Sequence, residues 1–248
     1  MAVVLETVGL TRYFGLVAAA DDVSVRIEAG ALVGIVGPNG AGKTTFLNLI
    51  TGYVKPEKGR ILHLGRDITG LSPRVVTALG IARSFQIPQL YTSLSVRENL
   101  LIALSIRAGY SLDFWNPLRR DVWIAEALDI LDQFGLREYA GRPVAELPEG
   151  GRKLLDIALS FALKPRLLLM DEPTSGVSMK DKFAVMDTLV GVLRRTGVTT
   201  VFVEHDMEVV YRYAGRVLVF SGGRIAADGD PQTLFADPHI RRAVIGLE

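Results

Sequence analysis

The chain of 248 residues contains no cysteine, which excludes disulfides, thiolate metal sites and cysteine nucleophiles. It also has almost no excess of charge, because 28 Lys and Arg face 27 Asp and Glu for a formal net charge of +1. Nucleic-acid-binding proteins usually gather a basic excess on one face, so we expect no nucleic-acid partner. No apolar run approaches the length of about 20 residues that a membrane-spanning helix needs. The start of the chain, Met1 to Glu6, lacks the basic region of a secretory signal. These absences predict a soluble chain that reaches a membrane only through a partner.

Hydrophobic residues at 49% and charged residues at 22% are values of a folded globular protein rather than a disordered one. The length fits one large domain or a domain with a sizeable subdomain. There are 25 glycines, about 10% of the chain against a usual value of about 7%. The position of these glycines therefore carries more information than their number.

Hydrophobic patterns divide the chain into strand and helix segments. Strands are predicted over 3–8, 23–27, 31–36, 60–64, 167–170, 199–203, 217–220 and 224–227. Helices are predicted over 44–50, 73–79, 121–134, 152–163, 181–195 and 208–213. The first two strands are expected to pair antiparallel and the last two to form a hairpin. Elsewhere strands alternate with helices, which predicts an α/β fold with a mostly parallel sheet, interrupted by a helical insertion from about 92 to 163.

A glycine-rich segment follows the apolar run 31–36 and reads Gly37-Pro38-Asn39-Gly40-Ala41-Gly42-Lys43-Thr44. It matches the phosphate-binding pattern G-x-x-x-x-G-K-[ST] between a strand and a helix. Its backbone N–H groups would surround phosphate oxygens, Lys43 would pair with the β- and γ-phosphates, and the Thr44 hydroxyl would bind Mg²⁺. Thr45, the next residue, is also a candidate for nucleotide binding. The alternative is an accidental glycine-rich turn.

The second half of such a site is an acidic residue at the end of a buried strand. The run 167–170 is followed by Asp171, a candidate Mg²⁺ ligand, and by Glu172, a candidate base or orienting group for an attacking water. An Asp-Glu pair also occurs where a strand merely reaches solvent. Combined with the phosphate loop, the pair predicts ATP hydrolysis.

In these motifs the chain resembles the ATP-binding subunits of ABC transporters, from end to end, with a P-loop NTPase core as the implied fold. The resemblance implies that Phe14 stacks on adenine, with Tyr13 as the alternative. It implies that Gln86 binds the metal and belongs to the catalytic set, and that His205 contacts the γ-phosphate. The implied organisation is a single nucleotide-binding domain over 1–248. Its α/β core with antiparallel β elements comprises 1–91 and 164–248, and its helical subdomain 92–163.

Two family motifs are altered in this chain. The signature Leu-Ser-Gly-Gly-Gln, which covers the ATP of the partner in a dimer, reads Leu147-Pro148-Glu149-Gly150-Gly151. Gly150 and Gly151 are kept as candidate contacts to that ATP, with a helix expected to follow from Lys153 to Leu163. Ser178 stands where the D-loop aspartate is expected. Because the chain's own nucleotide residues are intact, these changes predict a heterodimer with two unequal sites, a homodimer being the alternative.

Within the family, the segments 80–86, 94–100 and 236–247, and the insertion 113–121 with Trp115, are similar to subunits for uptake of branched-chain amino acids or related hydrophobic or amide solutes. The resemblance implies integral membrane permease partners, a second ATP-binding subunit, an indirect solute-binding protein, and a peripheral place on the cytoplasmic face of the inner membrane. A groove near Gln86 and 87–91, with Leu90, Tyr91 and Leu94 exposed, is expected to receive a helix of the permease, although these side chains could also pack in the subdomain's own core. The segment 113–120 is a second candidate contact, with a solvated loop as the alternative.

Other functions compete with this interpretation. A DNA-repair or translation ATPase of the same family would carry a coiled-coil insertion or two nucleotide domains, which this length and charge do not favour. A regulatory or weakly active nucleotide-binding module remains open because of the altered signature, as does an ATPase for another solute or for export. The three histidines have no metal-ligand spacing, so a metal hydrolase is not supported.

Overall fold

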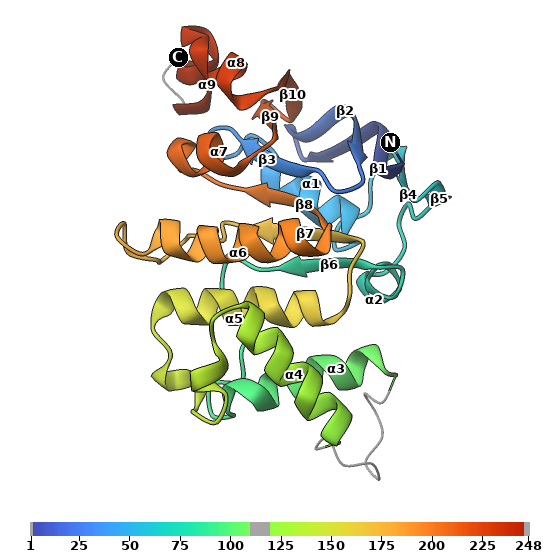
Figure 1. Ribbon diagram of the computed structural model, residues 1–248. Coiled ribbons are helices and arrows are strands. Elements are labelled where there is room, and N and C mark those ends of the chain that lie inside the picture. The colour runs from blue at the N-terminus through green and yellow to red at the C-terminus, as the bar shows by residue number, and fades with distance from the viewer. Residues whose placement is uncertain (1, 110–119, 246–248) are drawn as a thin grey trace.

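The computed structural model describes residues 2–109 and 120–245, and two sheets form its frame (Figure 1). The larger sheet has six strands in the order β10-β9-β3-β8-β7-β6, and the smaller has four in the order β2-β1-β4-β5. The strands are β1 (Val3–Phe14), β2 (Val17–Glu28), β3 (Leu32–Val36), β4 (Lys58–His63), β5 (Arg66–Asp67), β6 (Ile81–Ser84), β7 (Leu167–Asp171), β8 (Thr199–Val203), β9 (Arg216–Ser221) and β10 (Arg224–Gly229). The helices are α1 (Lys43–Ile50), α2 (Pro73–Ala78), α3 (Val96–Arg107), α4 (Asp121–Gln133), α5 (Glu149–Ala162), α6 (Lys182–Thr196), α7 (Met207–Tyr213), α8 (Pro231–Ala236) and α9 (Pro238–Ile245), with short 3₁₀ turns η1 (Arg137–Tyr139) and η2 (Val144–Glu146).

The larger sheet is parallel from β6 through β7, β8 and β3 to β9, and only β10 pairs antiparallel. In the smaller sheet, β1 pairs antiparallel with β2 and β4, and β4 pairs antiparallel with β5. The predicted α/β class is thus confirmed, with an N-terminal antiparallel sheet and a mostly parallel one. The predicted terminal hairpin is β9–β10.

The strands at the N-terminus are longer than the predicted runs 3–8 and 23–27. Each of β1 and β2 has 12 residues, joined by the turn at Gly15 and Leu16. The pairing of β1 with β2 contains register shifts, one of them between Thr7 and Leu10. With these shifts the pairing continues past the glycine and acidic residues that interrupt the apolar pattern. The local pattern ends at these residues, but the pairing does not.

Helix α5 begins at Glu149, three residues before the start at Arg152 of the predicted helix 152–163. Gly150 and Gly151 therefore lie in its first turn rather than in a loop before it. The added Cβ of an alanine at Gly150 would lie 3.0 Å from a methyl group of Val185 in α6. Glycine at this position lets α5 and α6 pack closely. Gly150 is therefore part of the helix and not of a preceding loop.

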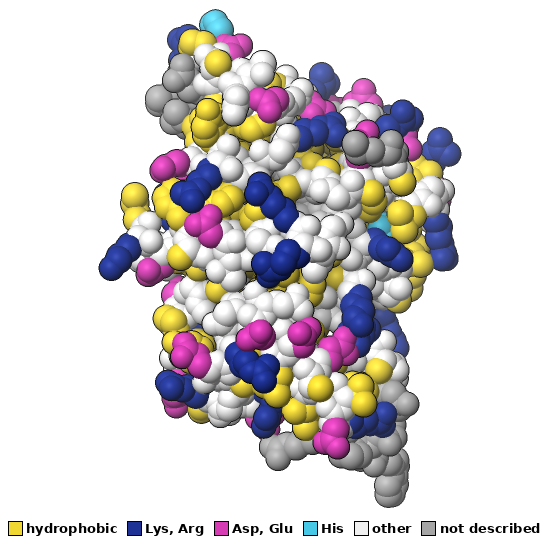
Figure 2. Space-filling model, in the orientation of Figure 1, with side chains coloured by type: hydrophobic (Ala, Val, Ile, Leu, Met, Phe, Trp, Pro, Cys, Tyr) yellow, Lys and Arg dark blue, Asp and Glu magenta, His cyan; other side chains and the backbone are white. Residues whose placement is uncertain are grey.

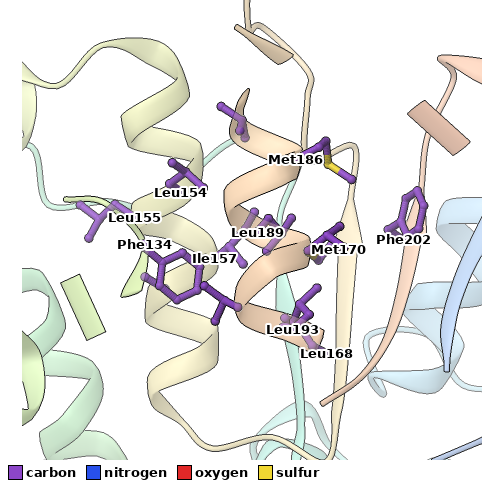
Figure 3. Packing of buried hydrophobic residues seen from close by; sticks show 14 of the residues in the cluster. Phe134, Leu154, Leu155, Ile157, Leu168, Met170, Met186, Leu189, Leu193 and Phe202 are labelled. Carbon is purple, nitrogen blue, oxygen red and sulfur yellow. The ribbon is translucent and has the colours of Figure 1, made fainter. Parts of the chain in front are cut away.

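Alternating residues of the parallel strands supply two cores, one on each face of the larger sheet. On β7, Leu168 and Met170 join helices α4, α5 and α6 in one cluster, which Figure 3 shows. Leu167 and Leu169 join β1, β2 and α1 in the other cluster. The near-continuous apolar runs of the sequence follow from this burial on both faces.

Helices α3, α4 and α5 pack on one another at the end of the molecule beyond β6 (Figure 1). None of the helices in residues 2–109 and 120–245 is long and apolar enough to cross a membrane. On the face drawn in Figure 2, basic and acidic side chains are interspersed.

Candidate active site

The loop between β3 and α1 is organised around Lys43. This residue is 6% exposed, and its Nζ donates to the carbonyl oxygens of Gly37 at 2.6 Å and Pro38 at 2.9 Å. Burial lowers the pKa of Lys43, while the nearby Glu172 and Asp171 carboxylates act in the opposite direction. The lysine therefore holds the loop in shape and lies close to both acidic residues that the sequence singles out.

The last glycine of the loop is fixed by geometry. Gly42 is the N-cap of α1 with φ of 102°, and an added Cβ would lie 2.2 Å from the carbonyl oxygen of Ala19. No side chain caps this helix, so its first N–H groups are left for an acceptor from outside. Such a helix start favours a phosphate or another anion.

The carboxylate of Asp171, at the end of β7, is paired with an arginine that the sequence analysis missed. Arg83 of β6 donates from Nη2 to Asp171 Oδ2 at 2.7 Å and from Nη1 to Asn48 Oδ1 at 2.6 Å. The side chains of Arg83 and Asp171 are only 5% and 6% exposed. A basic residue inside the apolar strand 81–84 is the one sequence signal that could have pointed to this pair.

The three predicted catalytic residues meet at the carboxylate of Glu172. Gln86 Nε2 donates to Oε2 at 2.8 Å, and His205 Nε2 lies 3.0 Å from Oε1. The backbone of Glu172 has φ of 51°, a left-handed conformation that is uncommon for a residue with a side chain. Such strained positions cluster at functional sites.

A cavity of about 310 Å³ joins the phosphate loop to these residues. That volume is within the range of about 300–1,000 Å³ for small-molecule sites. It is lined by Phe14, Val17, Ala19, Asn39, Gly40, Ala41, Gly42, Lys43, Thr44, Thr45, Glu172 and His205.

The remaining predicted residues lie outside this lining. Gly37 and Pro38 face Lys43 through their carbonyl groups, Gln86 binds Glu172, and Asp171 binds Arg83. Gly150 and Gly151, in the first turn of α5, do not line the cavity, and a Cβ added to either would lie within 3.0 to 3.3 Å of a side chain of this chain.

Among the residues that line the cavity, Phe14 is 47% exposed, with the Arg12 guanidinium 4.9 Å from its ring centre. Tyr13, the alternative to Phe14, donates its hydroxyl to Asp21 at 3.0 Å. The exposed ring of Phe14 is thus the aromatic surface that the cavity offers.

Glu204, immediately before His205, is a buried residue that the sequence analysis missed. Its Oε1 accepts hydrogen bonds from the backbone N of Thr174 at 2.9 Å and from Thr174 Oγ1 at 2.7 Å, and its Oε2 accepts from the backbone N of His205. Burial raises the pKa of Glu204. It ties the segment after Glu172 to the histidine.

The predicted metal ligands supply hydroxyl, amide and carboxylate oxygens from Thr44, Gln86 and Asp171, the donor type that Mg²⁺ prefers. This donor set fits a magnesium ion held jointly with phosphate oxygens. Among the described residues, no cluster of three or more His, Cys, Asp or Glu could hold a metal ion alone.

A second cavity, of about 320 Å³, lies between the segment 85–91 and helices α3 and α5. Its rim carries exposed apolar side chains, with Tyr91 59% and Ile106 51% exposed. Of the predicted contacts, Tyr91 is exposed, whereas Leu90 and Leu94 are partly buried and Leu90 packs on the core. The candidate contact 113–119 lies outside the described residues.

Comparison with known proteins shows which family the chain belongs to. The sequence pattern of the family described as "ABC transporter" matches residues 20–175. A "High-affinity branched-chain amino acid transport ATP-binding protein LivG" from Salmonella typhimurium is 35% identical over 246 residues, covering 96% of each chain. A "Probable branched-chain amino acid transport ATP-binding protein LivG" from Archaeoglobus fulgidus is 31% identical over 99% of this chain and 96% of that protein.

Among solved structures, the ADP conformation of an ATP-binding cassette of an ABC transporter superposes with a TM-score of 0.87 at 30% identity. The match covers 99% of this chain and 100% of the other. The chain therefore belongs to the ABC transporter family, as an ATP-binding subunit and an ATPase.

Proposed function

We propose that this chain hydrolyses ATP to energise the uptake of branched-chain amino acids or related small hydrophobic or amide solutes, through ATP-driven closure of a dimer. The observation that carries the proposal is the cavity shared by the phosphate loop, Glu172 and His205 in a chain similar over its whole length to LivG proteins. An ATPase for another solute or for export, and a weakly active regulatory module, are the competing functions.

Each residue of the site takes a role in this proposal. Phe14 stacks on adenine, and 37–45 surrounds the phosphates with Lys43 on the β- and γ-groups. Thr44, Gln86 and Asp171 are the residues that would hold Mg²⁺, which when bound neutralises charge on the phosphates. Glu172 orients or deprotonates the attacking water, and His205 and Gln86, bonded to its two oxygens, fix its carboxylate toward the γ-phosphate.

The test uses the chain assembled with its permeases in vesicles, with the ATP-binding subunit facing the lumen and the solute-binding protein added outside. Labelled leucine uptake should require internal ATP and should disappear in Glu172→Gln, while ATP binding persists. Uptake of an amide but not of leucine would show that the solute is an amide and not a branched-chain amino acid. ATPase activity that drives a solute out of the cell would favour an exporter. Absence of ATPase activity in the complex that keeps Glu172 would favour a regulatory module.

The division into a core of 1–91 and 164–248 and a helical subdomain of 92–163 is part of the proposal, as is the peripheral location on the cytoplasmic face of the membrane. We propose that the cavity between 85–91 and α3 receives a helix of the permease, because apolar side chains at its rim would be covered there. Replacing Tyr91 or Ile106 with serine should weaken capture of the permease in detergent. Unchanged capture would exclude this groove.

We further propose that the second ATP-binding subunit is a different chain. Pro148, the N-cap of α5, has neither a hydroxyl group nor an N–H to donate, so the half-site that this chain offers through Gly150 and Gly151 is weakened. Glu149 adds a carboxylate there, paired with Arg152 at 3.7 Å. Glu172→Gln here should therefore reduce the ATPase rate of the complex more than the equivalent change in the partner. Equal losses would contradict the asymmetry.

A further inference from the structure

Helix α5 has a buried polar side as well as an apolar one. Its leucine and isoleucine side chains meet α6, α4 and the sheet, as Figure 3 shows for Leu154, Leu155 and Ile157. Lys153, Asp156 and Ser160 follow one another at helical spacing and are 2%, 5% and 8% exposed. Burying charged groups costs free energy unless they are hydrogen-bonded, so this polar side requires hydrogen-bond partners within the protein.

The polar side follows the backbone of β6 and of the segment after it. Ser160 Oγ donates to the carbonyl oxygen of Arg83 at 3.0 Å. Asp156 accepts from the backbone N of Phe85 at 3.3 Å and of Gln89 at 3.1 Å. Strand β6 is the edge of the larger sheet, so the bond from Ser160 gives the carbonyl of Arg83 a partner where no further strand lies beside it.

Lys153 differs from the other two because it reaches two segments at once. Its Nζ donates to the carbonyl oxygen of Gln86 and, at 3.3 Å, to that of Glu172. These are the two residues whose side chains bind each other through Gln86 Nε2 and Glu172 Oε2. One ammonium therefore joins the backbones behind a functional side-chain contact.

The bond to Glu172 has a particular consequence. The left-handed backbone of Glu172 persists only if its surroundings hold it. Its N–H donates to the carbonyl oxygen of Val203 at 3.0 Å, and its own carbonyl accepts from Lys153. Without the ammonium, the peptide after Glu172 loses this partner, and the carboxylate is free to shift with its backbone.

We propose that Lys153 is a positioning residue for ATP hydrolysis, which sets the carboxylate of Glu172 by holding the backbones of Gln86 and Glu172 together. Lys153 does not line the nucleotide cavity, so it acts through Glu172 rather than on ATP. The proposal rests on the role of Glu172 in activating water. Since a misplacement of about 1 Å can cost about 100-fold in rate, the expected effect falls on kcat.

The experiment compares full-length Lys153→Met, Lys153→Arg and Ser160→Ala for ATPase kinetics, binding of a fluorescent ATP analogue and thermal melting. Methionine keeps the length of the side chain but donates no hydrogen bond, and arginine restores a cation that donates. Ser160→Ala is the matched control, since it removes one buried bond from the same side of α5 without touching Gln86 or Glu172. Glu172→Gln is measured in parallel.

The proposal predicts that Lys153→Met lowers kcat by about 100-fold with KM and nucleotide binding unchanged, that Lys153→Arg recovers most of the rate, and that Ser160→Ala keeps its kcat. Native kcat in Lys153→Met, while Glu172→Gln is inactive, would overturn the proposal and leave the role of Glu172 intact. Equal kcat losses in Lys153→Met and Ser160→Ala, or loss of ATP binding, would also overturn it, because the effect would be merely structural. Activity in Glu172→Gln would overturn both proposals together. If Lys153→Met does not fold, Lys153→Gln, which keeps one donor group, decides between the same outcomes.

Discussion

Removing the guanidinium of Arg83 tests how strongly burial controls the candidate metal site. In Arg83→Met, Asp171 keeps its place at the end of β7 but loses the cation 2.7 Å away, with both side chains almost fully enclosed. Breaking a buried pair by removing one partner costs about 3–5 kcal/mol, since a charge is left without compensation. For a chain of this length, that corresponds to a loss of about 6–20 °C in melting temperature.

Arg107→Met is the matched control. Arg107 pairs with Glu126 at 2.6 Å, nearly the same distance, but both side chains are 24% exposed and Lys164 also contacts Glu126. Such a pair contributes about 0.2–1 kcal/mol, and the bond from Arg107 to the carbonyl oxygen of Ala162 adds about 1 kcal/mol. The control should therefore melt a few degrees below the native chain and well above Arg83→Met.

Calorimetry or dye-based melting of both variants, without nucleotide or Mg²⁺, separates the two costs. Adding Asp171→Asn to Arg83→Met removes the uncompensated charge, so the double variant should regain about 2 kcal/mol relative to Arg83→Met. Equal losses in Arg83→Met and Arg107→Met would refute the reasoning from burial. A double variant no more stable than Arg83→Met would show that lost packing, and not the Asp171 charge, causes the instability.

Three further predictions concern buried or constrained groups. Burial raises the pKa of Asp156 from 3.8 to about 6, so its contribution to stability is present below pH 4 and is lost as the pH rises through 6. Between pH 4 and pH 7, the free energy of unfolding from urea titrations should therefore fall by about 3 kcal/mol less in Asp156→Asn than in the native chain. The same fall with pH in both proteins would contradict this. Glu204→Ala leaves the Thr174 and His205 donors without their acceptor and should cost at least about 2 kcal/mol in the same assay, a loss near zero being the contrary result. Gly42→Ala should abolish ATP binding, because the new Cβ would collide with the carbonyl oxygen of Ala19. Gly40→Ala has open space around the new Cβ, so it should still bind ATP and should lower the free energy of unfolding by only about 1–2 kcal/mol through backbone strain. Equal ATP affinities of these two variants would contradict the steric argument.

The sequence predicts those parts of the site that depend on neighbouring residues in the chain. The phosphate loop is read from one segment because its shape depends on its own glycines and on Lys43, which binds the carbonyls of Gly37 and Pro38. The parallel strands β3, β7, β8 and β9 are predicted because burial on both faces makes them largely apolar. Strand β6 is not among the predicted runs, because Arg83 interrupts its apolar pattern. The family resemblance then adds Gln86 and His205, which local patterns alone would not identify.

The unpredicted parts depend on contacts between distant segments. Lys153 and Gln86 are 67 positions apart, and Arg83 and Asp171 are 88 apart, so no local pattern links them. The start of α5 was misplaced because Pro148, Gly150 and Gly151 resemble a loop by propensity. Packing against α6 overrides that propensity at Gly150. Buried polar residues on a helix also look like solvent-facing residues until their partners are known.

The order of strands in the larger sheet explains why Glu172 has its particular neighbours. Residues that follow the carboxyl ends of adjacent parallel strands meet at one edge of a sheet. Strand β7 lies between β8 and β6, so Glu172 after β7 must lie between His205, which follows β8, and Gln86, which follows β6. Its two carboxylate oxygens accordingly take one partner from each side. Strand β3, on the far side of β8, places the phosphate loop next to His205, which explains why the loop, His205 and Glu172 line one cavity although their segments are far apart in sequence.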